Sequence, residues 1–431
     1  MSLPDRADVV VVGGGPAGSV ASTHLARRGY DVVLIDKVDH PRETVGESIL
    51  PPAWPYFDRL GVSEEIERQR FVKKAGGIVD WEGRITEIRF RDFAYKRPGL
   101  HVERGPLDHL ILENSRKSGV RVFNGIRAES FTRDQSGEME VSVAAGSGPP
   151  NARLACRYLI DASGQSCLAA RQSGGRRLDA DFRFISIWGY FAHSDYVGAD
   201  GVVYPSKEVQ NHPPMTFVSQ CGGWGWAWHI PMREMTSVGI VIEIEDYKRA
   251  VAKHSSLEDY FMATCQSTRF LGGLLAPAKM VNGGLRVLRD FSYLPERVSG
   301  PGYYVIGDAA GFVDPIFSIG YVMALYSGEL AAWSVDRSLK QEDRAEASRL
   351  MFEHQMRGRY ELARTMALPG VEPTGGPQLY FNFSSKAEKE LMWSAAALTT
   401  RSRNLVDSVT PGAEPHLKIR ELDGLQFSRV P

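Results

Sequence analysis

Ala7-Asp8-Val9-Val10-Val11-Val12-Gly13-Gly14-Gly15-Pro16-Ala17-Gly18 is the stretch that decides the fold of this chain. Its glycines follow the GxGxxG spacing, between a run of four valines and a helical pattern. The first glycine permits a tight turn, the second lets the backbone approach a pyrophosphate, and the third lets the helix pack closely on the strand. The N-terminus of the helix then presents N–H groups and the positive end of its dipole to phosphates. We therefore expect an adenine dinucleotide to be bound by Gly13, Gly15, Pro16, Ala17 and Gly18.

A second strand is expected at residues 32–35, and it ends at Asp36. Asp36 lies 36 − 13 = 23 residues after Gly13, where a carboxylate can bind a ribose hydroxyl. Strand, turn, helix, strand and acid agree, so an ordinary glycine turn explains the pattern less well. These residues leave FAD and NAD open as the dinucleotide.

Composition narrows the class of protein. The 431 residues suggest two or three structural units, and 43% hydrophobic with 24% charged residues is typical of a soluble globular chain. The formal net charge of −1 gives no indication of a nucleic-acid or membrane partner. No signal peptide precedes the first strand, and no apolar run reaches about 18 residues. Four scattered cysteines without CxxC pairs and ten histidines without HxxxH spacing predict a cytoplasmic protein with no metal site.

The rest of the chain shows mixed patterns. Residues 51–75 look helical, and alternating segments at 120–123 and 139–143 predict antiparallel strands around a turn at 146–150. Residues 180–245 are strand-like and rich in aromatic residues. A strand at 303–306 precedes a helix whose apolar positions have helical spacing: Val322, Leu325, Tyr326, Leu330 and Trp333. Beyond about residue 345 we expect a packed helical extension, broken at 369–370 and 375–377.

A late motif bears on the choice of cofactor. In Gly307-Asp308-Ala309-Ala310-Gly311-Phe312-Val313-Asp314-Pro315, a carboxylate ends a buried strand and small residues follow it. Such a segment can hold a ribityl chain and present amides to a flavin ring, although Asp308 could also be a simple helix cap. Together with a middle element at residues 161–164, the pattern resembles flavoprotein monooxygenases with one FAD domain. The lack of a second GxGxxG also favours a single tightly bound dinucleotide.

Three further segments resemble the flavin-dependent halogenases, in particular the short enzymes that act on phenols or pyrroles. They are Arg42-Glu43-Thr44-Val45-Gly46-Glu47-Ser48, the FxxKxG pattern at residues 71–76, and the WxWxIP pattern at residues 226–231. The resemblance implies that Lys74 is the catalytic lysine and that Glu47 orients the intermediates. Without it, Lys73 and Lys74 are an ordinary solvated pair, and Glu47 binds a backbone amide. The further cofactor-binding residues implied are Lys37, Arg42, Ser48, Arg104, Asp161, Asp308, Gly311 and Gly320.

The implied chemistry uses FAD in its reduced form (FADH2), O2, and chloride or bromide. Hypohalous acid formed from them is relayed by Lys74 to an electron-rich aromatic, free or tethered to a carrier protein, in antibiotic biosynthesis or similar specialised metabolism. A lysine suits this role because burial readily shifts its pKa. A separate flavin reductase is the expected partner, and a homodimer is left open. The implied tunnel wall, for which core packing is the alternative, comprises Trp226, Trp228, Ile230, Pro231 and Phe317.

The chain departs from the family at the implied halide site, which comprises Ser318, Ile319 and Gly320. These halogenases usually have two small hydroxyl residues and a glycine there, and Ile319 replaces the second hydroxyl. Halide binding is then weaker, altered toward bromide, or lost. The alternatives are therefore an FAD-dependent hydroxylase or oxidase of the same fold, and a non-catalytic flavoprotein.

The expected fold class is α/β: a Rossmann-like FAD domain interleaved with a mainly antiparallel substrate sheet, plus a C-terminal helical extension. Within a discontinuous core at 1–345, residues 1–75, 100–180 and 290–345 are expected around FAD, 76–99 and 181–289 in the substrate sheet, and 346–431 in the extension.

Overall fold

The valine run forms β1 (Arg6–Val12), in the middle of a parallel sheet. This strand pairs in parallel with β2 (Val32–Ile35) and β11 (Ala152–Asp161). All four valines are buried, with alternate side chains in separate clusters on the two faces of the sheet. A strand covered on both faces needs a continuous apolar run, which explains why the sequence does not alternate there. The predicted strand–helix–strand unit is confirmed, with α1 (Pro16–Ala26) as its helix.

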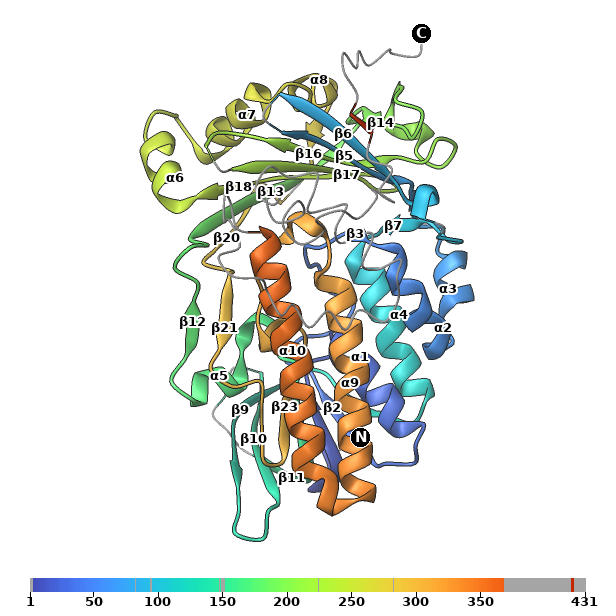
Figure 1. Ribbon diagram of the computed structural model, residues 1–431, viewed down its shortest axis with the longest axis vertical. Coiled ribbons are helices and arrows are strands. Elements are labelled where there is room, and N and C mark those ends of the chain that lie inside the picture. The colour runs from blue at the N-terminus through green and yellow to red at the C-terminus, as the bar shows by residue number, and fades with distance from the viewer. Residues whose placement is uncertain are drawn as a thin grey trace, which may run out of the picture.

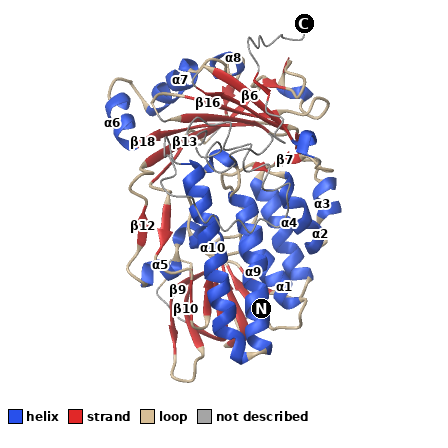
Figure 2. Ribbon diagram, viewed as in Figure 1, coloured by secondary structure: helices blue, strands red, loops and turns tan. Residues whose placement is uncertain are grey.

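The computed structural model describes residues 3–81, 83–93, 95–146, 148, 152–223, 225–281, 283–367 and 420–421. Two large sheets lie at opposite ends of the molecule, with long helices packed beside the first of them (Figures 1 and 2). The sequence prediction of an α/β protein is therefore confirmed. The breaks predicted in the C-terminal helical extension, at 369–370 and 375–377, lie outside the described residues.

The first sheet has the order β22-β23-β11-β1-β2-β8, and the antiparallel pair β9 and β10 extends from β11. Residues 121–123, predicted as antiparallel, instead form a parallel edge strand on β2. A three-residue alternating pattern does not specify direction, and the free edge of β2 decides it. The remaining strands are β8 (Arg121–Phe123), β9 (Ile126–Arg133), β10 (Met139–Ala145), β22 (Ser299–Gly300) and β23 (Tyr303–Val305).

The second sheet has the order β19-β13-β18-β17-β16-β5-β6-β24, with β20 also on β13. Its described pairs are antiparallel except β5 with β16, and helices α6 to α8 lie along its outer side (Figure 1). Its strands are β5 (Gly76–Trp81), β6 (Arg84–Arg89), β13 (Phe184–Ala192), β16 (Met215–Gln220), β17 (Trp226–Pro231), β18 (Thr236–Glu243), β19 (Lys279–Met280), β20 (Arg286–Arg289) and β24 (Arg420–Glu421). Its helices are α6 (Ile244–Val251), α7 (Leu257–Ser267) and α8 (Leu271–Leu274).

A third, small antiparallel sheet has the order β3-β7-β4. Its strands are β3 (Ser48–Ile49), β7 (Gly99–His101) and β4 (Val72–Lys74). The prediction that residues 51–75 are helical is thus wrong at its end, because only α2 and α3 are α-helical there and residues 72–74 pair with β7. The other elements are α2 (Trp54–Leu60), α3 (Ser63–Arg68), α4 (Arg104–Lys117), α5 (Leu168–Gln172), β12 (Arg176–Leu178), β14 (Tyr196–Val197), β15 (Val203–Tyr204), β21 (Tyr293–Pro295), α9 (Gly320–Lys340) and α10 (Ala345–Ala367).

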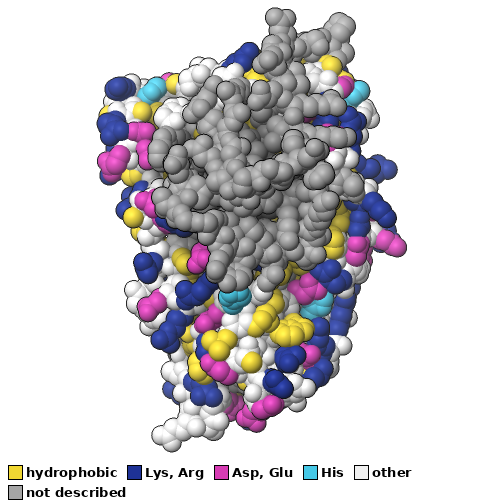
Figure 3. All heavy atoms as spheres, in the orientation of Figure 1, with side chains coloured by type: hydrophobic (Ala, Val, Ile, Leu, Met, Phe, Trp, Pro, Cys, Tyr) yellow, Lys and Arg dark blue, Asp and Glu magenta, His cyan; other side chains and the backbone are white. Residues whose placement is uncertain are grey.

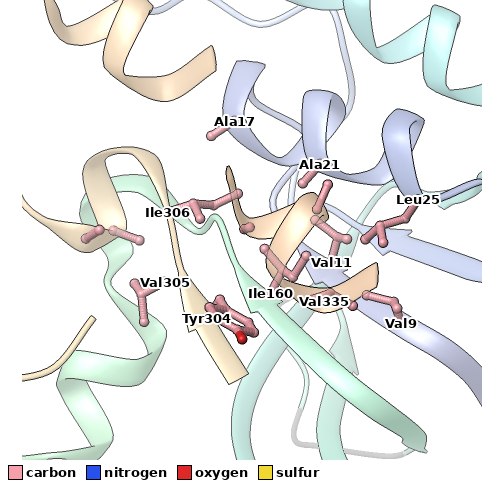
Figure 4. Packing of buried hydrophobic residues seen from close by; sticks show 14 of the residues in the cluster. Val9, Val11, Ala17, Ala21, Leu25, Ile160, Tyr304, Val305, Ile306 and Val335 are labelled. Atoms are coloured by element: carbon pink, nitrogen blue, oxygen red, sulfur yellow. The ribbon is translucent and has the colours of Figure 1, made fainter. Parts of the chain in front are cut away.

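The core of the first half lies between the parallel sheet and helices α1 and α9. Figure 4 shows Val9, Val11 and Ile160 of the sheet below Ala17 and Ala21 of α1. Helices α1 and α9 approach so closely that a Cβ at Gly328 would lie 2.4 Å from the carbonyl oxygen of Ala17. This contact locks the start of α1, and with it the glycine turn, against α9.

The predicted apolar face of the late helix is correct only in part. Leu325 is fully buried, whereas Trp333 is 40% exposed with Arg337 over its ring. The core still covers the helix at this point, since Ala332 and Ser334 are fully buried, so Trp333 lies off the buried face. On the face shown in Figure 3, acidic and basic side chains are interspersed over the coloured part. Within the described residues, we find no helix both long and apolar enough to cross a bilayer.

Candidate active site

The small sheet brings two predicted site residues together. Its middle strand, β7, pairs Gly99 with Lys74 on one side and His101 with Ser48 on the other. The lysine side chain passes over Gly99, where a Cβ would lie 3.3 Å from its Cδ. Its Nζ then donates a hydrogen bond of 2.7 Å to Ser48 Oγ. A glycine at the middle strand therefore makes room for the lysine to cross it.

Lys74 is an unusual lysine because it is only 4% exposed. Burial lowers its pKa from 10.5 to about 7, since the ammonium has lost its water. The ring of Phe90 lies beside it, with the centroid 5.4 Å from Nζ. Lys73, the preceding residue, points to solvent. The strand alternation thus divides the pair into one solvated and one buried lysine.

Glu47 is also buried, at 2% exposure, and directly precedes Ser48. Its Oε1 accepts a hydrogen bond of 2.7 Å from the Tyr190 hydroxyl, and its Oε2 accepts one from the Gly46 N–H. Burial raises the pKa of the carboxyl, against the opposing effects of these hydrogen bonds and of Arg104. Glu47 therefore makes both the backbone amide contact, which the sequence offered as the alternative to a catalytic role, and a side-chain contact with Tyr190. Tyr190 was not identified from the sequence, because the two partners lie 143 residues apart and no local motif links them.

The glycine turn fits a dinucleotide. Gly13 has φ +110°, and a Cβ there would lie 2.2 Å from the Ala162 carbonyl oxygen. A Cβ at Gly18 would lie 2.0 Å from the Gly13 carbonyl oxygen, so both positions require glycine. Such a turn lets the backbone approach a diphosphate closely, as the fingerprint requires. Gly15, Pro16 and Ala17 form the entry to α1 behind this turn.

Asp36 ends β2 next to the turn, as predicted. Its Oδ2 accepts a hydrogen bond of 2.7 Å from the Gly14 N–H and lies 3.2 Å from His40 Nε2. Burial alone raises its pKa, but hydrogen bonds from His40, Val38 and Gly14 hold it below the usual value. The group is therefore a carboxylate at neutral pH, which is the form that accepts from a ribose hydroxyl.

Two arginines lie near the turn and the late motif. The Nη2 of Arg42 lies 3.4 Å from the position that a Cβ on Gly15 would take. Arg104 contacts the loop of Glu47, donating to the Val45 carbonyl at 2.9 Å, and it pairs with Asp108, whose side chain is fully buried. The ion pair of Arg104 with Asp108 is therefore mostly buried and not an ordinary surface pair. The contact of Arg104 with flavin stays a prediction.

Asp308 lies on the turn after β23, where burial raises its pKa to about 6 although Arg104 and Arg42 lower it. Tyr360 of α10 donates to the carbonyl of Gly311, the left-handed end of this turn, at 2.5 Å. Helix α10 thereby holds the late motif, a contact that no motif in the sequence suggested.

Two predicted cofactor residues are occupied by other contacts. Both carboxylate oxygens of Asp161 accept backbone N–H groups, from Ser163 at 3.0 Å and Ala169 at 2.7 Å. Asp161 therefore holds the turn that flanks Gly13. Lys37 is exposed and donates to Ser166 of the same turn region at 2.6 Å. Direct contact of either with FAD stays a prediction.

Four of the five predicted tunnel residues share one apolar cluster, which joins the segment at 226–230 to Phe317. Trp226 and Trp228 are buried on β17, with ring centroids 5.7 Å apart. Phe317 belongs to the same cluster, and Ile319 packs against it. Trp228 Nε1 donates to Ser237, whereas Trp226 Nε1 has no hydrogen-bond partner within the described chain. Ile230 is a cluster member too, and the Pro231 carbonyl accepts from His101.

The predicted halide segment directly precedes α9. Ser318 has φ +57°, a left-handed conformation that is uncommon outside glycine, and Gly320 is the first helical residue. Ile319 stands between them with its side chain on the apolar cluster rather than offering a hydroxyl. Ile319 thus contacts the same apolar cluster as Trp226 and Trp228.

Comparison with known proteins places the chain among characterised relatives. An FAD binding domain family model matches residues 6–221. The chain is 31% identical over 377 residues to a 1H-pyrrole-2-carbonyl peptidyl-carrier-protein chlorinase of Pseudomonas fluorescens, covering 81% of this chain and 80% of that relative. It is 35% identical to a tryptophan 2-halogenase of Chondromyces crocatus, over 78% of this chain. The chain spans only 62% of the length of that relative.

Solved structures agree with this grouping. The structure of the myxobacterial chondrochloren halogenase superposes with a TM-score of 0.77 at 25% identity, covering 96% of this chain and 93% of that one. A second flavin-dependent halogenase, CmlS, gives a TM-score of 0.75 at 28% identity, covering 84% of this chain and 64% of that one. The chain therefore belongs to the flavin-dependent halogenases and carries the FAD-binding domain of that family.

Proposed function

We propose that this protein is an FAD-dependent halogenase that uses FADH2, O2 and halide to halogenate an electron-rich aromatic. The observation that carries the proposal is Lys74: a lysine that is 4% exposed, hydrogen-bonded to Ser48, with a pKa near 7. A buried ammonium destabilises a fold, so its presence without a carboxylate partner among the described residues favours a chemical role. Its neighbours in the chain and in space are residues that the family resemblance also singled out.

The residues would divide the work as follows. The diphosphate would lie on the Gly13–Gly18 turn, and Asp36 would accept from the ribose. Arg42, Arg104 and the turn at Asp308 would face the flavin. When bound, FADH2 would supply two of the electrons that reduce O2 and halide the other two, so that one oxygen atom ends in hypohalous acid and the other in water. Ser318 and the amides at Ile319 and Gly320 would hold the halide.

Lys74 would then act on the hypohalous acid. With a pKa of about 7, both its ammonium and its amine are populated at neutral pH. The ammonium can donate a hydrogen bond to the oxygen of hypohalous acid and polarise the O–halogen bond. The amine can instead attack the halogen, so that the O–halogen bond breaks, a haloamine forms and water leaves. Glu47 would orient the reacting species, and Tyr190 would hold Glu47. The wall of Trp226 and Trp228 would keep water and the aromatic away from the flavin.

The proposed substrate is a phenol or a pyrrole, free or tethered to a carrier protein. One relative is named as a chlorinase of a carrier-bound pyrrole, which supports the tethered form. A separate flavin reductase would supply FADH2. We further propose the domain division set out from the sequence, with the parallel sheet serving FAD and the larger antiparallel sheet serving the substrate.

A second candidate function is hydroxylation by the same fold, and Ile319 is the observation that favours it. The experiment supplies purified protein with a flavin reductase, NADH, FAD, O2 and either chloride or bromide. Phenols and pyrroles are offered free and carrier-loaded, and products are read by mass spectrometry. Halogen addition that requires Lys74 supports the proposal, whereas products that gain only oxygen support the hydroxylase.

A further inference from the structure

We infer that His101 is a positioning residue that fixes the small sheet β3-β7-β4, which carries Lys74, against the tryptophan strand. The tryptophan strand is β17, which carries Trp226 and Trp228. The inference rests on the proposed role of Lys74. His101 is the last residue of β7 and is fully buried. Its two ring nitrogens reach two different strands of the large sheet. Nδ1 lies 2.9 Å from the Pro231 carbonyl oxygen, and Nε2 lies 2.7 Å from Thr216 Oγ1.

The partners determine the tautomer. A carbonyl oxygen can only accept, so Nδ1 carries the proton and donates to Pro231. Nε2 is then the acceptor, and the Thr216 hydroxyl donates to it. Burial, with the nearby charge of Lys74, lowers the pKa of His101 well below its ordinary value, which agrees with a neutral ring. Both nitrogens are satisfied by the neutral ring in this orientation, and a flipped ring would place carbons where these two nitrogens now lie.

The small sheet carries its functional side chains on the same face as His101. His101 and Gly99 are two residues apart on β7, so they share a face. Cross-strand partners also share a face, and these are Ser48 opposite His101 and Lys74 opposite Gly99. The ammonium, its serine acceptor and the histidine therefore lie on one surface of the small sheet.

The hydrogen-bond partners of His101 lie on the tryptophan strand and on the strand beside it. Pro231 is the last residue of β17, five residues after Trp226, and Thr216 lies on the neighbouring strand β16. The two hydrogen bonds thus join the surface that holds the lysine directly to the strands that form the apolar wall. Each bond fixes a distance between two separate sheets, which packing alone fixes less tightly. Moving the sheets apart would leave a gap between lysine and wall through which hypohalous acid could escape.

The test replaces Thr216 with valine, which keeps the shape and removes the hydroxyl that donates to Nε2. The T216S variant keeps the hydroxyl and should rescue the defect. S194A is the matched control, since it removes a similar buried hydroxyl, 2.8 Å from Nε2 of His229. H101N keeps one donor for Pro231 and serves if T216V proves unstable.

Two readouts are measured on the FAD-loaded enzyme. The first is coupling, as halogenated product formed per O2 consumed, with escaped hypohalous acid captured by a β-diketone. The second is nitrogen-15 NMR of the histidine rings, which reports tautomers without any turnover. We expect T216V to lower coupling about fivefold or more and to increase captured hypohalous acid, with T216S and S194A near wild type. We also expect wild type to show one neutral Nδ1–H histidine that changes in T216V.

The outcomes separate the two proposals. Unchanged coupling in both T216V and H101N would overturn the positioning role while leaving the halogenase proposal intact. A wild-type enzyme that adds no halogen would instead overturn the proposed function. The NMR arm then decides the state of His101: the Nε2–H tautomer would refute the hydrogen-bond geometry argued for it, and a protonated ring would refute its neutral state.

Discussion

Replacing Lys74 with methionine should make the protein more stable at neutral pH while abolishing halogenation. A pKa of about 7 in place of 10.5 corresponds, at about 1.4 kcal/mol for each pH unit, to about 5 kcal/mol. This is the destabilisation that the buried ammonium causes when it is fully protonated. Methionine has a similar length and no charge, so it avoids that cost. It loses the hydrogen bond to Ser48, which offsets about 1–2 kcal/mol.

The sign of the pH dependence follows from proton binding. Between about pH 7 and 10.5 the unfolded lysine binds more protons than the folded one, so the stability of the wild type rises with pH in that window. The destabilisation is complete below about pH 7, falls to about 2 kcal/mol near pH 9 and vanishes above pH 10.5. We therefore expect K74M to be about 3 kcal/mol more stable than wild type at pH 6, with the advantage shrinking as pH rises.

Urea unfolding at pH 6, 7 and 9, with equal saturating FAD, measures the free energies. K73M is the matched control, since Lys73 is exposed and its loss should change stability by less than about 0.5 kcal/mol. The reasoning is refuted if K74M is less stable than wild type at pH 6, or if the difference between them does not depend on pH.

Three other substitutions test separate parts of the site. G13A should lower FAD affinity at least tenfold and destabilise the protein by about 2–5 kcal/mol, because the new Cβ would lie 2.2 Å from a carbonyl oxygen. Fluorescence titration and urea unfolding measure the two effects, and wild-type affinity for FAD would contradict the prediction. Y190F removes a hydrogen bond that lowers the pKa of Glu47, and this pKa should therefore rise. The acid limb of the pH profile of kcat should then move to higher pH, and an unmoved limb would argue against a role for the Glu47 carboxylate. I319S restores a hydroxyl beside Ser318, and the KM for chloride should fall about threefold to tenfold in initial-rate assays; an unchanged KM would remove Ile319 from the halide site.

The sequence was enough to predict those parts of the site whose residues lie close together in the chain. The valine run, the glycine turn and Asp36 lie within 36 residues, and the structure has them as the sequence predicted. The fingerprint requires glycine where a Cβ would strike the backbone, so its spacing carries the geometry with it. Lys74 is intermediate, because the motif marks it but only the pairing of β4 with β7 makes it buried.

Long-range contacts could not be predicted in the same way. Tyr190 reaches Glu47 across 143 residues, and His101 reaches Pro231 across 130. No periodicity in either segment encodes such a partner, since each depends on how two sheets dock. The predictions that β8 is antiparallel and that Trp333 lies on the apolar face were wrong for a related reason. Neighbouring elements decide both the direction of that strand and the face of the helix that is buried.

The central claim is that Lys74 delivers halogen to the substrate, and a direct comparison of wild type with K74A tests it. Both proteins are given the same FADH2, O2, bromide and preferred aromatic, and brominated product and O2 consumption are followed together. We expect K74A to consume O2 at close to the wild-type rate, because Lys74 lies outside the FAD-binding turn, while brominated product falls at least 100-fold. Bromination by K74A at the wild-type rate would contradict the claim.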